Sequence, residues 1–229
     1  MKRFERLDEA AAPDGTVLTL YRHDGAYVIR VGGVELMSTR RHHSEERFAE
    51  LVCAPLRDTP RARVLVGGLG LGFTLRAALA LLAPDAAVDV VELVEAVIRW
   101  NAEPAYDLAG SAMRDPRVTV RHDDVARVLA ASPGAYDGVL LDVDNGADAL
   151  TTASNAQLYR DAGVRTAAAA LRAGGRLGYW AAGDEPALAD ALRRAGLRVE
   201  ATRARAHATT GPRHTLYVAH RDAPGGDGR

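Results

Sequence analysis

Acidic side chains occur at the ends of several apolar segments of this sequence. Glu92 ends the segment 87–92, Asp123 and Asp124 follow 117–121, and Asp142 ends the segment 136–142. A carboxylate at such a position can accept hydrogen bonds from ribose hydroxyls or an adenine amino group, and it can orient an amine or accept its proton. These acids therefore predict a site that binds a nucleoside next to a nucleophile. The alternative for each is a structural role, on the surface or as the cap of the next segment.

The segment 64–75, Val-Leu-Val-Gly-Gly-Leu-Gly-Leu-Gly-Phe-Thr-Leu, joins an apolar run to an Ala- and Leu-rich helical pattern through glycines. Glycine lets the backbone turn sharply and lets a flat nucleoside lie against the main chain. A dinucleotide fingerprint needs G-x-G-x-x-G, whereas the spacing here is G-x-G-x-G. That spacing resembles motif I of class I S-adenosylmethionine-dependent methyltransferases; the alternative is a glycine-rich turn of another α/β protein. The candidate cofactor-binding residues of the turn are Gly68, Leu69, Gly70, Leu71 and Gly72.

The elements that must position these residues alternate between strands and helices from Arg63 onward. Such alternation predicts a parallel sheet covered on both faces, and ligands of these sheets bind beyond the carboxyl ends of the strands. A closing hairpin around Gly211 and Pro212 would make the last strand antiparallel. We expect strands at 63–67, 87–92, 117–121, 136–142, 176–181, 197–205 and 213–220, and helices at 72–83, 94–112 (in pieces), 124–131, 155–171 and 185–195.

The first 60 residues have a different pattern. Short segments rich in β-branched and aromatic residues at 16–21, 26–31 and 34–37 are separated by hairpin signals, which predicts a small antiparallel β-meander after an irregular start at 1–13. A helix is expected at 44–57, with Ser44 as its N-cap and Cys53 on its apolar face. We therefore predict an N-terminal meander with a connecting helix (1–60), a nucleoside-binding domain (61–222) and a disordered tail (223–229).

Composition excludes several classes of function. The 229 residues carry 29 basic and 30 acidic side chains, a balance that gives no reason to expect nucleic acid or an anionic membrane as a partner. His42 and His43 are adjacent, so their side chains point apart, and a metal site is not expected. No G-x-S-x-G supports serine hydrolysis. Neither a signal peptide nor a membrane span is visible, so we expect a cytoplasmic protein.

The order and spacing of several segments resemble the polyamine aminopropyltransferase, or spermidine synthase, family across roughly residues 15–200. The resemblance implies an α/β, Rossmann-like class I methyltransferase fold, with a seven-stranded, mostly parallel sheet whose last strand is antiparallel, and a small N-terminal antiparallel β-meander. The segments that carry it are Val64–Leu75, Val90–Leu93, Asp115–Val118, Tyr136–Asp142, Leu158-Tyr159 and Leu171–Gly175.

The resemblance also implies roles for individual residues. Glu92 and its neighbour Leu93 would bind the ribose side of the cofactor, and Asp124, or else Asp123, would bind the adenine. Asp142 falls on the catalytic aspartate of the family, and Glu45 would be the acid on the substrate side. The remaining candidates for the acceptor pocket are His43, Glu46, Asp144, Tyr159 and Trp180. Trp180 could equally be a half-buried aromatic residue of the core.

Departures from the family pattern bear on the donor. The first loop of the family reads G-G-G-D-G-G, and Leu71 stands at the position of its aspartate. That aspartate would pair with the ammonium of decarboxylated S-adenosylmethionine and repel the carboxylate of S-adenosylmethionine, an effect on the order of a few kcal/mol in a partly dry site. Two further departures are Asn145, which replaces an aspartate, and His43, which replaces a tyrosine.

These departures favour methyl transfer from S-adenosylmethionine to an amine or another small nucleophile. The first alternative is aminopropyl transfer from decarboxylated S-adenosylmethionine, as in polyamine synthesis. The second is a non-catalytic nucleoside-binding protein. We expect the loop 145–155 to close over the acceptor. The resemblance implies a possible homodimer, which the short N-terminal region leaves open.

Overall fold

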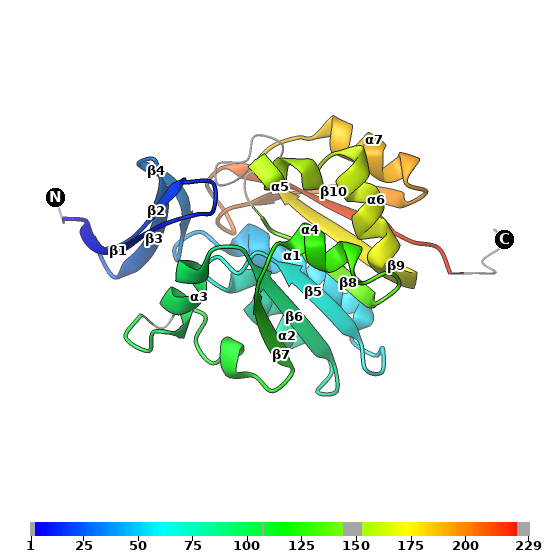
Figure 1. Cartoon of the computed structure of the whole chain (residues 1–229), viewed down its shortest axis with the longest axis horizontal. Helices are drawn as coiled ribbons and strands as arrows, with labels where there is room; N and C mark the ends of the chain where they lie inside the picture. The colour runs from blue at the N-terminus through cyan, green and yellow to red at the C-terminus, as the bar shows by residue number, and fades with distance from the viewer. Residues whose placement is uncertain (1–2, 107, 144–152, 224–229) are drawn as a thin grey trace.

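The larger sheet of the protein has seven strands, as expected. In the computed structural model, which describes residues 3–106, 108–143 and 153–223, its strand order is β10-β11-β9-β8-β5-β6-β7 (Figure 1). β11 is antiparallel to both β9 and β10, whereas β5 is parallel to β6 and β8. The predicted fold class is therefore confirmed. The strands are β5 Arg63–Gly67, β6 Ala87–Glu92, β7 Val118–His122, β8 Tyr136–Leu141, β9 Leu171–Ala181, β10 Arg198–Arg205 and β11 Arg213–His220.

A second sheet, of four antiparallel strands, contains β1 Glu5–Ala11, β2 Val17–His23, β3 Ala26–Val31 and β4 Val34–Ser38. The meander is confirmed, but the expectation of an irregular start is wrong, because β1 pairs with β2 from Glu5 to Ala11. β1 is a mostly exposed edge strand, so its pairing depends on the backbone and leaves no hydrophobic alternation in the sequence. This smaller sheet is joined to the helix Glu95–Ala102, where Asp8 accepts a hydrogen bond from Trp100 Nε1 at 2.6 Å.

The described helices and 3₁₀ turns are α1 His43–Cys53, η1 Ala54–Leu56, α2 Phe73–Leu81, α3 Glu95–Ala102, η2 Ala112–Arg114, α4 Val125–Ala130, α5 Ala153–Leu158, α6 Asp161–Ala170 and α7 Pro186–Arg194. The single helix expected at 155–171 is wrong: the extended backbone of Arg160 separates α5 from α6. α3 ends at Ala102 because Glu103 precedes Pro104, and a residue before proline disfavours helical backbone. β9 begins earlier than expected and includes Gly174 and Gly175, where its register with β8 shifts.

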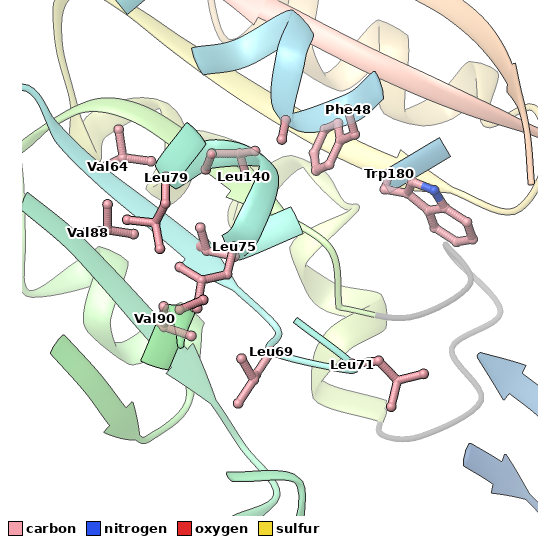
Figure 2. Close-up of a cluster of buried hydrophobic side chains, with 14 of the residues drawn as sticks. Phe48, Val64, Leu69, Leu71, Leu75, Leu79, Val88, Val90, Leu140 and Trp180 are labelled. Carbon is pink, nitrogen blue, oxygen red and sulfur yellow. The ribbon is translucent and has the colours of Figure 1, made fainter. Parts of the chain in front are cut away.

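The two faces of the large sheet bury two separate cores. Val64 and Val66 of β5 belong to the core that also contains α1, α2 and α3, whereas Leu65 points into the core with α4, α6 and α7. This alternation is the two-residue period of a strand covered on both sides. Figure 2 shows the first core, with Leu69 and Leu71 beyond the ends of the strands. Its side chains stabilise the sheet whose tips form the site.

Helix α1 lies directly on the sheet, because strand β9 presents a glycine beneath it. A Cβ at Gly178 would lie 2.6 Å from Phe48 Cε2 and 2.8 Å from Val52 Cγ2. Cys53 is fully buried on the same side, as expected, and burial raises the pKa of its thiol to about 12. Ser44 is not the N-cap, which is instead His42; Ser44 is fully buried inside the first turn. This close packing brings the start of α1 to the strand tips.

The predicted division at residue 60 stays a prediction. The predicted tail lies, from residue 224 on, outside the described residues. In the part of the chain that the structure describes, none of the helices is long and apolar enough to span a membrane.

Candidate active site

The glycine turn between β5 and α2 lies against the tip of β8. Gly68 has φ +90°, and a Cβ there would lie 2.2 Å from the carbonyl oxygen of Asp142, so a larger residue would collide with backbone. Gly70, with φ +51°, faces Met37 of β4: its Cβ would lie 2.9 Å from the Met37 sulfur. Gly72 has φ +79° and is the N-cap of α2. Such a turn can present backbone to a ligand, and the cofactor-binding role given to it from the sequence stays a prediction.

Glu92 connects this turn to the tip of β6. Its Oε2 accepts a hydrogen bond from the backbone N–H of Leu69, and its Oε1 accepts one from the N–H of Val94, both at 2.8 Å. The side chain is buried, with 8% exposed. Each carboxylate oxygen has a second lone pair, so Glu92 can hold the loop and still accept a ribose hydroxyl.

Asp123 and Asp124 differ in their partners. Asp124 is the N-cap of α4, where its Oδ1 accepts a hydrogen bond from the N–H of Ala126 at 2.8 Å. Asp123 pairs with Arg127 at 2.6 Å, and this hydrogen bond holds the pKa of Asp123 below its usual value. Both aspartates, with Glu92 and Leu93, line a cavity of about 60 Å³, which we call the donor cavity. Its other lining residues are Leu18, Ile29, Leu36, Met37, Gly68, Gly70, Val91, Val94, Val97, Val125, Asp142 and Val143.

A second cavity, of about 190 Å³, adjoins the first; we call it the acceptor cavity. The two share Leu36, Met37, Gly70 and Asp142. It draws its other lining residues from segments far apart in the chain: Glu35, Ser38, Arg41, Glu45, Leu69, Leu71, Phe73, Trp180, Ala206, Pro212 and His214. A molecule held in one cavity therefore lies next to a molecule held in the other.

Asp142 stands where the two cavities meet. Its backbone N–H donates to Gly67 O at 2.9 Å, and its Oδ2 accepts a hydrogen bond from Thr74 Oγ1 at 2.6 Å. Thr74 belongs to the first turn of α2, so the glycine turn that shapes the donor cavity also orients this carboxylate. The carboxylate can accept a proton from, or hold the charge of, a group placed in the acceptor cavity.

Glu45 is the second acid of the acceptor cavity. Burial, followed by the nearby negative charge of Asp142, raises its pKa to about 7. The hydroxyl of Ser44 donates a hydrogen bond to Glu45 Oε2 and opposes this rise. A carboxylate that titrates near neutral pH is suited to general acid–base chemistry.

The structure brings together most of the predicted site residues, but not all. Neither cavity includes His43, Glu46, Tyr159 or Gly72 among its lining residues. Glu46 pairs with His42 at 2.9 Å, and the hydroxyl of Tyr159 donates to Trp180 O from within the core. Asp144, and residues 145–152 of the expected acceptor loop, lie outside the described residues. The roles given to all these residues stay predictions.

The residues of the acceptor cavity that were missed from the sequence include Glu35, Met37, Arg41 and His214. Arg41 forms an ion pair with Glu35. Burial, and then the charge of Arg41, lowers the pKa of His214 to about 4. The four come from β4, the connection to α1 and β11, and no local motif marks any of them. Across the described ranges, no group of three or more metal-binding side chains occurs.

Sequence comparison finds a curated relative, and no family model matches the chain. A polyamine aminopropyltransferase from Corynebacterium efficiens is 34% identical over 151 residues, which make up 64% of this chain and 27% of that protein. The chain thus spans about a quarter of the length of the curated relative it matches.

Solved structures show the same fold. A spermidine synthase in complex with the transition-state analogue AdoDATO has a TM-score of 0.72 at 17% identity, covering 94% of this chain and 72% of that chain. The spermidine synthase from Thermotoga maritima has a TM-score of 0.68 at 18% identity, with the same coverage. A probable spermidine synthase from Corynebacterium glutamicum has a TM-score of 0.66 at 17% identity, covering 94% of this chain and 79% of that one.

Fold and strand order define a Rossmann-like protein of the class I methyltransferase type. Within that class the chain resembles the polyamine aminopropyltransferases, or spermidine synthases, and the resemblance predicted from the sequence is confirmed. These relatives carry the name of the alternative activity, aminopropyl transfer, so they favour it over the methyl transfer expected first.

Proposed function

We propose that this chain transfers an aminopropyl group from decarboxylated S-adenosylmethionine to a small amine. The names of its relatives support this activity. The observation that carries the proposal is the position of Asp142, which lines both the donor and the acceptor cavity. An acid at that junction is adjacent to both partners of a transfer reaction.

The residues of the donor cavity fit a sulfonium nucleoside. A side chain at Gly70 would fill the space against Met37, so glycine keeps the backbone open there. Glu92 would accept hydrogen bonds from the ribose hydroxyls. Asp124, or else Asp123, would accept one from the adenine amino group. When bound, the sulfonium supplies an activated carbon and a neutral thioether leaving group.

Asp142 and Glu45 would receive the amine on the acceptor side. A neutral amine nitrogen forms a C–N bond as the C–S bond breaks, and the electron pair of that bond goes to sulfur. The attacking nitrogen becomes positively charged, and the acids hold this charge or accept the proton that leaves. The main contribution of the protein is to hold the two partners in line and exclude water.

Leu71 favours a second candidate, methyl transfer from S-adenosylmethionine itself. Its side chain is buried, with 2% exposed, and lines the acceptor cavity. An apolar side chain offers nothing to the ammonium of a decarboxylated donor, and it does not repel the carboxylate of the ordinary donor. The acceptor would again be a small nucleophile beside Asp142.

Titration calorimetry with both donors, followed by mass analysis after incubation with a diamine such as putrescine, tests the two candidates. Aminopropyl transfer predicts tighter binding of the decarboxylated donor and release of methylthioadenosine. Tighter binding of S-adenosylmethionine, with a methylated product, would favour the second candidate. Binding without turnover of any amine in a panel would favour the non-catalytic alternative. A homodimer stays a prediction that light scattering of the same sample checks.

A further inference from the structure

A chain of hydrogen bonds links the two sides of the acceptor cavity. His214 Nδ1 lies 2.9 Å from Ser44 Oγ, and the Ser44 hydroxyl donates to Glu45 Oε2. Ser44 and Glu45 lie in the first turn of helix α1. His214 belongs to β11 and is 170 residues away from Ser44 in the sequence. Ser44 has no exposed surface, so water does not compete for its hydroxyl.

The direction of these bonds fixes the proton on His214. A hydroxyl has one hydrogen, and that of Ser44 is directed to Glu45, so Ser44 can only accept from His214. While Glu45 is ionised, Nδ1 therefore carries the hydrogen. His214 is neutral at pH 7 because burial lowers its pKa to about 4. Nε2 then has a free electron pair, on a ring that lines the acceptor cavity.

The ring of His214 is itself held in place. The indole of Trp180 packs against it, with ring centroids 4.4 Å apart. β11 pairs with β9 at this level, with Thr215 opposite Ala181. His214 is therefore a fixed donor, and Ser44 is prevented from turning its hydroxyl away from Glu45.

We propose that His214 is a positioning residue, which acts through Ser44 to orient the Glu45 carboxylate toward the acceptor amine. This proposal rests on the proposed function, because it gives Glu45 the role of receiving an amine. It adds a residue that no motif predicts. The nitrogen that has attacked carries a positive charge, and an ionised carboxylate can hold that charge or accept its proton. The Ser44 hydrogen bond stabilises this ionised form of Glu45.

The charged and titratable groups around Glu45 are Asp142, Glu46, Glu35, Arg41 and His214. Asp142 and Glu46 raise the pKa of Glu45, whereas the Ser44 hydroxyl lowers it. Loss of the Ser44 hydroxyl should therefore move the titration of Glu45 upward, by about one pH unit for a lost hydrogen bond to a charged group. The acid limb of the plot of kcat/KM against pH should move upward by the same amount.

The experiment compares Ser44→Ala, His214→Leu and His214→Asn with the unaltered chain. The asparagine amide can take the place of Nδ1–H as a donor to Ser44, whereas leucine cannot. We expect Ser44→Ala to shift the acid limb of the kcat/KM profile upward by about one pH unit. His214→Leu should shift this limb upward by less, and His214→Asn should keep it at the position found in the unaltered chain. His220→Asn, at the far end of β11 and outside both cavities, is the matched control and should leave the profile unchanged.

Two measurements do not need turnover. Nitrogen-15 NMR of the unaltered chain should find the hydrogen of His214 on Nδ1, and carbon-13 NMR of the Glu45 carboxyl should show the same upward shift in Ser44→Ala. A hydrogen on Nε2, or a rate loss in His214→Leu that is equal at every pH, would overturn the positioning role. If no amine is turned over but both NMR results hold, the proposed function fails and the chain linking His214, Ser44 and Glu45 stands.

Discussion

The donor and acceptor cavities share a border but are built differently. The donor cavity is lined largely by the tips of neighbouring parallel strands and the turns that follow them, between Gly68 and Val143, with Leu18, Ile29, Leu36 and Met37 from the N-terminal sheet. The acceptor cavity combines β4, the start of α1, the glycine turn, β9 and β11, from Glu35 to His214. Local turns form most of the first cavity, whereas packing between distant segments forms the second.

This difference explains where specificity can change. The donor side is constrained by backbone: Gly68 leaves no space for a side chain, and Glu92 holds two backbone N–H groups. The acceptor side is lined by side chains such as Trp180, Arg41 and His214. Those side chains can be exchanged without moving a strand, so the same frame can serve different acceptors.

Asp142→Asn should produce the largest effect, because it removes the acid at the junction of the cavities. We expect the transfer rate to fall by about 10²- to 10⁴-fold, the usual contribution of a positioned acid or base. The affinity for the donor nucleoside should stay nearly unchanged. Rapid-quench turnover and titration calorimetry measure the two quantities.

Asp137→Asn, near the other end of β8, is the control for that substitution. Asp137 accepts hydrogen bonds from the backbone of Arg63 and from Arg172, outside both cavities. This variant should lose thermal stability but keep its rate. A normal rate in Asp142→Asn would contradict a catalytic role and favour a nucleoside-binding protein without turnover.

Glu92→Gln should have the next largest effect, and on the donor side alone. An amide has one carbonyl oxygen, so it cannot accept from both Leu69 and Val94 and from a ribose hydroxyl as well. We expect the Kd for methylthioadenosine or S-adenosylhomocysteine to rise about 10- to 100-fold, which corresponds to about 1.5–3 kcal/mol for hydrogen bonds to a charged group. Glu95→Gln, an exposed neighbour on α3, should bind normally. Equal affinities in the two variants would refute the ribose role.

The donor side could be predicted from the sequence because its signals are local. Gly68, Gly70, Glu92 and Asp142 each follow a strand whose apolar run is visible, and parallel strands place their carboxyl ends at one edge of the sheet. The mostly parallel sheet with an antiparallel last strand followed from the alternation and from the resemblance. The break at Arg160 and strand β1 did not, because neither leaves a hydrophobic period.

The acceptor side could be predicted only in part. Glu45 and Trp180 were found because the family resemblance and a strand end pointed to them. His214 and Arg41 were missed, because they reach the cavity through the antiparallel addition of β11 and the turn after β4. Tyr159 is the converse case: it was a candidate for the acceptor pocket, but its hydroxyl donates a hydrogen bond to Trp180 O in the core. Such contacts depend on tertiary packing, which no spacing rule encodes.

Leu71→Asp should shift the choice of donor by a smaller amount. A carboxylate in the acceptor cavity attracts the ammonium of decarboxylated S-adenosylmethionine and repels the carboxylate of S-adenosylmethionine. We expect the affinity ratio of the two donors to change about tenfold, or about 1.4 kcal/mol, in favour of the decarboxylated form. Leu71→Asn, which adds polarity without charge, should leave the ratio close to that of the unaltered chain. An equal shift in both variants would show that polarity, not charge, controls the choice.

Glu45→Gln tests the smallest effect, on stability rather than rate. The folded-state pKa of Glu45 is about 7, above its ordinary value of 4.5. Between these values the folded chain binds more protons than the unfolded chain, so the contribution of Glu45 to stability is present at low pH and is lost as pH rises through about 7. Glutamine does not titrate, so Glu45→Gln should gain stability relative to the unaltered chain from pH 4.5 to pH 8, by about 1 kcal/mol after relaxation around a buried charge is allowed for. Urea unfolding at both pH values measures this gain, and Glu50→Gln, an exposed position on the same helix, should show none. A gap that is the same at both pH values would mean that Glu45 titrates like a surface acid, and the acceptor cavity would then lack an acid whose pKa lies near 7.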